Sequence, residues 1–339
     1  MRADLSRFYD FGRFDLSQIR TNRLFFSVFF RIKFCVEKAY FYGDLIAELK
    51  QLKEQGIEVG TIGKTQLGFE IPYVFLGKKT DTSLVVVGST HAREHITTLL
   101  VMKQIRHYLK NQTVLNGGIY FVPMHNVDGV RICTEGVGFI QDEQRVKQIL
   151  KVNGGHDFSN WKANADCVDL NTNFDAHWGE GSQNLFFPSP FSYVGKKPMS
   201  ESENICLAEF LQKIKPDYLI TYHTKGEIIF WQFFQEKLRK WRDYRLAKFV
   251  AKQTGYRLVG QTQSAGGLKD WCVEKLRIPA VTVEVGEDKY AYPYPYSQID
   301  KIFKKNAEVP QKMLNTLAKE KKYGKKVYEA GDEGGAKGI

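Results

Sequence analysis

Apolar residues recur along the chain in two spacings. Within 42–55 they fall three or four positions apart, at Leu45, Ile46, Leu49 and Leu52, which is the period of an amphipathic helix. Elsewhere they form short runs such as SLVVV at 83–87, which are typical of strands buried inside a sheet. The pattern predicts helices over 42–55, 94–109, 201–213, 237–254 and 298–317. It predicts strands over 59–63, 71–76, 83–87, 118–122, 218–222, 228–233 and 280–285.

Helices and strands that alternate in this way indicate an α/β fold with helices on both faces of the sheet. In open sheets of this class, ligands collect at the carboxyl ends of the strands. His91, His223 and Glu284 each come at or just after the end of a predicted strand. We therefore expect these three acid-base side chains to meet at one edge of the sheet.

The distribution of residue types predicts one catalytic domain with an appendage at each end. Residues 1–38 are Arg-rich, aromatic and without clear periodicity, and are predicted to be an N-terminal extension. No repeat or Pro-rich linker divides 39–317, which is predicted to be a single domain. Residues 318–339 are basic and end in glycines, a composition typical of a flexible tail.

Charge and cysteine content limit the partners and the compartment. The net charge of +11 favours an anionic polymer over a cationic one as substrate, but no nucleic-acid recognition motif occurs. The five cysteines are odd in number and form no CxxC pair, as expected for reduced thiols. The apolar stretch LFFSVFF at 24–30 is too short to span a membrane and has no cleavage site after it. A cytoplasmic location without a membrane span is therefore expected.

The stretch VVVGSTHAREH at 85–95 concentrates candidate metal ligands, and it can be interpreted in two ways. His91 and His95 could bind a metal from one helix with Glu94 as the base, the H-x-x-E-H arrangement. Alternatively, His91 and Glu94 are ligands and a third lies far along the chain. The turn residues at 88–90 favour the second interpretation, because they place His91 before the helix rather than inside it. His223 is then available as the third ligand. A carboxylate such as Glu284 inside an apolar strand must be paired or used in catalysis.

Five motifs in order, HAREH, DLNTNFD, YVGKKPMSESE, YHTKG and TVEVG, resemble those of the zinc carboxypeptidase family over about residues 40–315. The resemblance implies a mixed sheet of roughly eight strands and one Zn2+ per chain. It implies that His91, Glu94 and His223 bind the metal, that Glu284 is the catalytic carboxylate, and that His95 is not a ligand.

The same resemblance gives roles to two further residues. Asp169 matches the family aspartate that accepts a hydrogen bond from the first histidine and fixes its tautomer, although a turn cap is an alternative role. Lys162 follows Trp161 at the position where the family has an arginine that stabilises the oxyanion. Lysine lacks the bidentate geometry of that arginine.

Two departures from the family pattern bear on the substrate. Carboxypeptidases bind the terminal carboxylate with the arginine of an Asn-Arg pair, but here Asn171 is followed by Thr172. The position of the family tyrosine that closes over substrate corresponds to Thr262. Removal of single C-terminal residues is therefore not expected.

The DLNxNFD form, YHxKG with a following aromatic strand, and EVG are similar to one branch of the family, the bacterial gamma-D-glutamyl-L-diamino-acid endopeptidases. These enzymes cleave peptidoglycan stem peptides before meso-diaminopimelate. Lys269, at the position that sets pocket preference, would then contact a substrate carboxylate, or else pair with Asp270. The resemblance thus implies hydrolysis of peptidoglycan-derived peptides. The alternatives are a metallocarboxypeptidase acting on other peptides, a zinc deacylase of acylated amino acids that uses Arg93, and a non-catalytic wall-peptide binder.

Overall fold

The computed structural model describes residues 40–80 and 82–334, with side chains described as far as Tyr323. All of these residues belong to one compact unit, Glu37–Ile339. The predicted N-terminal extension, 1–38, lies outside the described residues. Among the described residues, no helix combines the length and the apolar content needed to cross a membrane.

Eight strands form one sheet in the order β1-β2-β4-β3-β5-β8-β6-β7. Their bounds are β1 (Glu58–Lys64), β2 (Glu70–Gly77), β3 (Ser83–Val87), β4 (Gly118–Val122), β5 (Tyr218–Thr224), β6 (Ile228–Phe230), β7 (Arg257–Val259) and β8 (Ala280–Val285). The four central strands, β4, β3, β5 and β8, are parallel, and antiparallel pairs join β1 to β2, β2 to β4 and β8 to β6. The predicted mixed sheet of about eight strands is confirmed.

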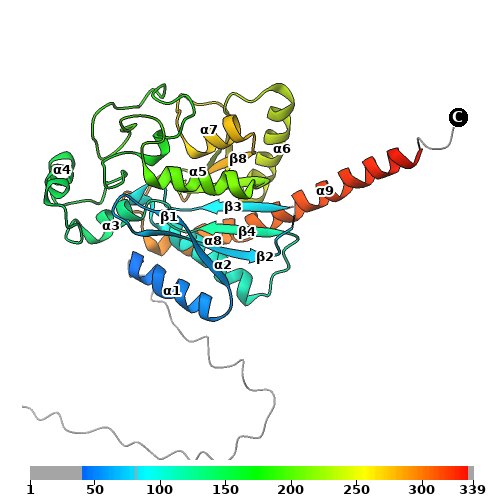
Figure 1. Ribbon diagram of the computed structural model, residues 1–339, viewed down its shortest axis with the longest axis horizontal. Helices are drawn as coiled ribbons and strands as arrows, with labels where there is room; N and C mark the ends of the chain where they lie inside the picture. Colours follow the sequence, from blue (N-terminus) through cyan, green and yellow to red (C-terminus); the bar gives the residue numbers. More distant parts are fainter. Residues whose placement is uncertain (1–39, 81, 335–339) are drawn as a thin grey trace, which may run out of the picture. The chain divides into compact units, whose positions relative to one another are not determined.

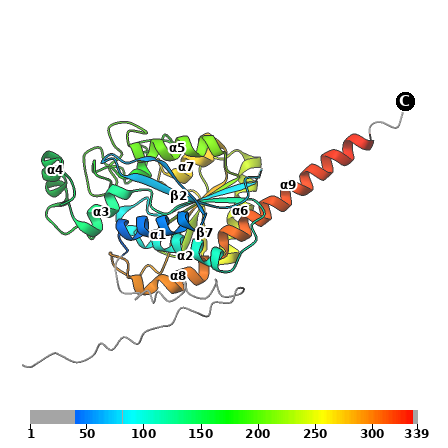
Figure 2. The ribbon, with the colours of Figure 1, turned by 60° about the horizontal axis from the view of Figure 1, so that its bottom comes forward.

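Helices cover both faces of this sheet, as predicted. Figures 1 and 2 show α5 and α7 on one face and α2 and α8 on the other. The helices are α1 (Tyr42–Glu54), α2 (Ile96–Lys110), α3 (Val127–Glu135), α4 (Glu143–Asn153), α5 (Ser202–Ile214), α6 (Lys237–Thr254), α7 (Leu268–Trp271), α8 (Ile299–Asn306) and α9 (Val309–Gly334). The central parallel strands are buried between these layers, which explains why their sequences are almost continuously apolar.

The C-terminal part of the chain differs from the sequence prediction. The stretch 298–317, predicted as one helix, is divided between α8 and α9. Pro310 is the second residue of α9, where its missing N–H removes no helical hydrogen bond, so a helix begins there easily. The stretch from 318, predicted as a flexible tail, is helical as far as Gly334. Its Lys, Glu and Ala residues have high helix propensity.

Candidate active site

The connection between β3 and α2 determines how the HAREH motif is presented. β3 ends at Val87, and the amide of Gly88 donates to the carbonyl of Val122 on β4. A side chain at position 88 would meet the carbonyl oxygen of Pro123 at 2.6 Å, so only glycine fits this close approach. His91 itself has extended backbone angles, and a short 3-10 turn over Ala92–Glu94 separates it from α2. His91 and His95 therefore do not stand one turn apart on a helix, the geometry that H-x-x-E-H requires.

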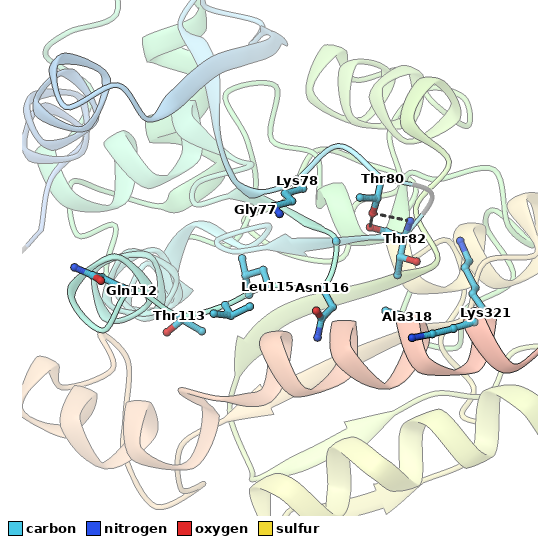
Figure 3. Close-up of a pocket in the computed structure, with 13 residues that line it drawn as sticks. Gly77, Lys78, Thr80, Thr82, Gln112, Thr113, Leu115, Asn116, Ala318 and Lys321 are labelled. Carbon is cyan, nitrogen blue, oxygen red and sulfur yellow. Dashed lines mark hydrogen bonds between the residues drawn. The ribbon is translucent and has the colours of Figure 1, made fainter.

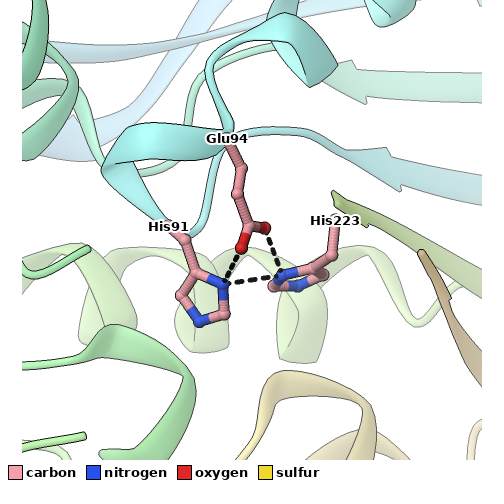
Figure 4. A group of neighbouring side chains, drawn as sticks. All are labelled: His91, Glu94 and His223. Carbon is pink, nitrogen blue, oxygen red and sulfur yellow. Dashed lines mark hydrogen bonds and ion pairs between the residues drawn. The ribbon is translucent and has the colours of Figure 1, made fainter. Parts of the chain in front are cut away.

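Three side chains from two distant segments converge at the carboxyl edge of the sheet. His91 Nδ1 lies 2.9 Å from Glu94 Oε1. His223 Nδ1, from the end of β5, lies 3.0 Å from His91 Nδ1 and 3.0 Å from Glu94 Oε2. All three side chains are buried, and Figure 4 shows their polar atoms pointing toward one another. Two imidazole nitrogens and a carboxylate directed at one point match the protein ligands of a catalytic zinc site.

The charge state of Glu94 agrees with a cation-binding role. Burial disfavours its ionised form, but His91 and His223 outweigh burial and hold the pKa of the carboxyl below its usual value. The amide of Thr224 also donates to Glu94 Oε2 at 3.2 Å. His95 lies elsewhere, because its ring packs against Tyr296 and its Nδ1 hydrogen-bonds to the Tyr296 hydroxyl. The sequence prediction had likewise excluded His95 from the ligands.

The contacts of Asp169 are compatible with both roles that the sequence left open. Its Oδ1 lies 3.2 Å from His91 Nε2, so it can fix the imidazole orientation. It also accepts from the amides of Asn171 and Ser192, at 3.1 Å and 3.0 Å, and the first of these contacts caps a 3-10 turn. Asp169 is fully buried, which disfavours ionisation, but Lys162 and His91 outweigh burial and keep its pKa well below the usual value.

Lys162 reaches this region because its neighbour is anchored. Trp161 is fully buried in a small apolar cluster with Phe158, Ile132 and Ile149. The Lys162 amide donates to the carbonyl of Pro190, and its ammonium lies 2.9 Å from Asp169 Oδ2. The structure thus places Lys162 beside the three converging side chains.

Glu284 enters from the next strand. In the parallel pairing of β5 with β8, Glu284 is directly opposite His223. Burial and the nearby Glu94 carboxylate raise the pKa of Glu284 to about 7, although His223, Lys162 and Arg93 act in the opposite direction. A carboxyl with a pKa near neutrality can both accept and donate a proton, as a general acid-base group must.

The two predicted substrate-binding residues lie around the start of α7. Asn171 Oδ1 accepts from the Leu268 amide at 3.1 Å, which ties the DLN motif to this helix. The ammonium of Lys269 is buried; it pairs with the Asp270 carboxylate and donates to the Gln232 carbonyl at 3.0 Å. The structure therefore shows the Asp270 pairing that was the alternative to a substrate contact.

The sequence prediction gave no role to Tyr292. The guanidinium of Arg93 lies 4.2 Å from the centre of the Tyr292 ring, and the Tyr292 hydroxyl donates to the Thr224 carbonyl at 2.7 Å. Tyr292 thus lies beside Thr224, whose amide donates to Glu94. The only sequence signal was the aromatic run 290–296 shortly after Glu284, which belongs to no motif.

One cavity lies at the opposite edge of the sheet. It has a volume of about 720 Å³ and is lined by the end of β2, the start of β4 and part of α9, including Gly77, Gly117 and Ala318 (Figure 3). β3 enters the sheet at this edge, at Ser83, and leaves it just before His91. The length of β3 therefore separates this cavity from the three converging side chains.

One relative of the chain has an activity in its name. The chain is 29% identical over 283 residues to gamma-D-glutamyl-L-diamino acid endopeptidase 1 of Lysinibacillus sphaericus, covering 79% of this chain and 70% of the relative.

Two solved structures share the fold. Bovine thrombin-activatable fibrinolysis inhibitor, in complex with tick carboxypeptidase inhibitor, superimposes with a TM-score of 0.68 at 19% identity, covering 84% of this chain and 99% of that one. Carboxypeptidase A from Helicoverpa armigera does so with a TM-score of 0.63 at 15% identity, covering 84% of this chain and 74% of that one. At such identities the likeness concerns the fold alone.

The model of the zinc carboxypeptidase family matches residues 42–309, which is most of the chain. This match agrees with the sheet order, with the convergence of two histidines and a glutamate, and with the ordered motifs. The chain therefore belongs to the zinc carboxypeptidase family and is a zinc-dependent metallopeptidase.

Proposed function

We propose that this metallopeptidase hydrolyses the gamma-D-glutamyl-meso-diaminopimelate bond of peptidoglycan stem peptides, with one zinc ion per chain. The observation that carries the proposal is Thr172. Its hydroxyl lies 2.9 Å from the Asp169 carbonyl and 3.2 Å from the Tyr193 carbonyl, so it is engaged with backbone. No guanidinium stands at this position to bind a C-terminal carboxylate. The similarity to the Lysinibacillus endopeptidase supports the same substrate class.

His91, Glu94 and His223 would hold the zinc, since their donor atoms converge and are buried. Bound zinc supplies Lewis-acid polarisation of the scissile carbonyl and lowers the pKa of the attacking water. Glu284, whose pKa is raised to about 7, takes the proton from this water and delivers it to the leaving nitrogen. The Lys162 ammonium donates to the oxygen on which negative charge develops. Asp169 orients both His91 and Lys162 through its two oxygens.

Lys269 is proposed to bind a carboxylate of the diamino acid. Its ammonium has three N–H donors, and the Gln232 carbonyl and the Asp270 carboxylate use two of them. The third remains for a substrate carboxylate. Burial makes such a charge-assisted contact stronger than it would be in water.

Two other activities fit the same metal site. A metallocarboxypeptidase acting on other peptides would need a cationic side chain at a position other than 172 to bind the terminal carboxylate. A deacylase of acylated amino acids would use Arg93, but its guanidinium already stacks on Tyr292.

A small substrate panel tests the proposal. We expect cleavage of L-Ala-gamma-D-Glu-meso-diaminopimelate at the gamma-glutamyl bond and little release of ordinary C-terminal residues. Replacing meso-diaminopimelate by L-Lys removes one carboxylate and should lower kcat/KM by about ten- to a hundredfold. Lys269→Met should remove that difference, while the control Lys275→Met, an exposed lysine in the turn after α7, should keep it.

The panel also distinguishes the alternatives. Efficient trimming of standard peptides from their C-termini would show a carboxypeptidase. Release of acyl groups from single amino acids would show a deacylase. If Lys269→Met discriminates as strongly as the wild type, another residue recognises the diamino acid.

A further inference from the structure

Exposed large apolar side chains are concentrated in two segments of the chain. Of the eleven such residues in the part of the chain whose side chains are described, seven lie within 186–191 and 234–244. We call the first segment, with Phe186, Phe187 and Phe191, the phenylalanine loop. We call the second, with Phe234, Leu238, Trp241 and Tyr244, the α6 face. Such clustering marks an interaction surface, because scattered exposed apolar residues are normal but grouped ones are not.

Ring contacts connect the two segments into one surface. The ring of Phe186 meets Trp178 edge to face, with 6.3 Å between ring centres. The neighbouring His177 stacks on Phe234 at 4.3 Å with an interplanar angle of 10°. Phe234 lies just before α6, and on the helix itself Leu238, Trp241 and Tyr244 follow at steps of three residues, which keeps them on one side. Leu238 is 86% exposed and Trp241 is 67% exposed, so neither is held in the protein core.

Basic residues flank the α6 face. The helix has seven Lys or Arg residues and one acidic residue, Asp243. Asp243 is buried and already pairs with Arg242. Lys237 and Lys240 are exposed, and neither makes an ion pair with any residue that the structure describes. The exposed side of α6 therefore carries aromatic, aliphatic and cationic groups together.

We propose that the α6 face and the phenylalanine loop dock on an anionic lipid surface. Trp, Phe and Leu beside Lys and Arg are the combination that places a helix in the headgroup region, where apolar side chains enter and cations meet lipid phosphates. Trp241 is the aromatic type most typical of that interface. A carbohydrate-binding surface would combine aromatic rings with polar, hydrogen-bonding neighbours. An exposed leucine such as Leu238 would contribute nothing to such binding.

This docking surface adjoins the active site on the side of the phenylalanine loop. The carbonyl of Pro190 accepts from the Lys162 amide, and the amide of Ser192 donates to Asp169. These two residues flank Phe191. Docking would therefore hold the catalytic residues close to the bilayer and to substrates attached to it. The docking itself does not depend on the identity of the substrate or on the proposed function.

Sedimentation of the full-length zinc protein with vesicles tests the proposal. We expect binding to vesicles of phosphatidylglycerol and phosphatidylcholine, weak binding to phosphatidylcholine alone, and loss of binding at high salt. Lys237→Gln with Lys240→Gln should weaken binding by about tenfold or more, since each basic residue near an anionic surface contributes about fivefold. Leu238→Ser with Trp241→Ser should weaken it at least as much. Val114→Ser, an exposed aliphatic residue outside both segments, is the matched control and should bind like the wild type.

Thermal unfolding of each variant shows whether the fold is retained, which is expected because every substituted residue is exposed. Three results would overturn the proposal. In the first, the wild type sediments no better with anionic vesicles than without them. In the second, the Leu238/Trp241 double variant binds as tightly as the wild type. In the third, the wild type binds insoluble peptidoglycan but not vesicles, and the Leu238/Trp241 double variant loses the binding to peptidoglycan. That result would identify a wall polymer as the occupant.

Discussion

Two of the clusters of buried polar side chains among the described residues differ in the direction in which the pKa values of their carboxyl groups are shifted. The active-site cluster consists of His91, Glu94 and His223. The carboxylate cluster consists of Asp128, Glu201 and Glu203. In the first, the two histidines outweigh burial and hold the pKa of Glu94 below its usual value. In the second, burial dominates and raises the pKa of Asp128 to about 6 and that of Glu203 to about 8.

The hydrogen-bond donors in the carboxylate cluster lower the pKa values of its carboxyl groups but do not outweigh burial. Asp128 accepts from the Thr65 hydroxyl at 2.6 Å and from the Leu67 amide at 2.9 Å, which fixes the β1–β2 hairpin turn against α3. Glu201 accepts from the Asn164 amide group and from the neighbouring Ser200 hydroxyl, both at 2.6 Å. These donors are neutral and each serves to hold a loop. Burial of a carboxyl group therefore does not by itself point to a catalytic site, whereas its convergence with two imidazole nitrogens does.

The largest expected difference between the clusters concerns the metal. His223→Ala should abolish both zinc binding and peptidase activity, because it removes one of three converging donors. His125→Ala is the matched control, since His125 is an equally buried histidine in the loop after β4 whose Nε2 contacts the Glu203 main-chain carbonyl at 3.1 Å. It should keep one zinc per chain, measured by elemental analysis after dialysis. Full zinc occupancy in His223→Ala would remove His223 from the ligand set.

A smaller effect, on peptidase turnover, is expected when carboxyl groups with raised pKa values are replaced by amides. Glu284→Gln should lower kcat by at least about a hundredfold while zinc content is unchanged, because the amide cannot exchange a proton with water. Glu203→Gln makes the same chemical change in the carboxylate cluster and should retain activity within a few-fold. Comparable turnover in the two variants would exclude Glu284 as the general base. A large loss of folding stability in Glu284→Gln would indicate a structural carboxyl instead.

The sequence was sufficient for most of the sheet because central strands are short, apolar and bounded by turns. It missed β7, which has one exposed and two half-exposed residues at the sheet edge and therefore no distinctive pattern. It also missed α4, in which Ile149 is the one fully buried position and the apolar stripe is thin. The division between α8 and α9 was missed because the helical period continues across it.

The residues of the candidate site also fall into those that the sequence could predict and those that it could not. His91, His223 and Glu284 could be predicted to meet, since parallel strands bring their carboxyl ends to one edge. The sequence left the pairing of Lys269 with Asp270 and a contact with substrate as two alternatives, because adjacent residues on a helix do not ordinarily face each other. The position of Tyr292 depends on the path of a loop, and no periodicity determines that path. Sequence therefore predicts residues at strand ends better than residues whose contacts depend on loops.

The smallest expected effect is a pH dependence of stability that belongs to the carboxylate cluster. Burial raises the pKa of Glu203 from its ordinary value of 4.5 to about 8 in the folded chain. Folding therefore favours the protonated carboxyl. The stability contributed by Glu203 is complete below the unfolded pKa and is lost as the pH rises through the folded pKa. The free energy of unfolding should therefore fall by about 1–4 kcal/mol between about pH 5 and about pH 8. Glu203→Gln should flatten this slope in urea unfolding, whereas Glu209→Gln, an exposed carboxyl on α5, should leave it unchanged. If the unfolding free energy of Glu203→Gln keeps the full dependence on pH, burial does not raise the pKa of Glu203. A buried carboxyl without cationic neighbours would then ionise normally, and the two clusters would not differ in the way described.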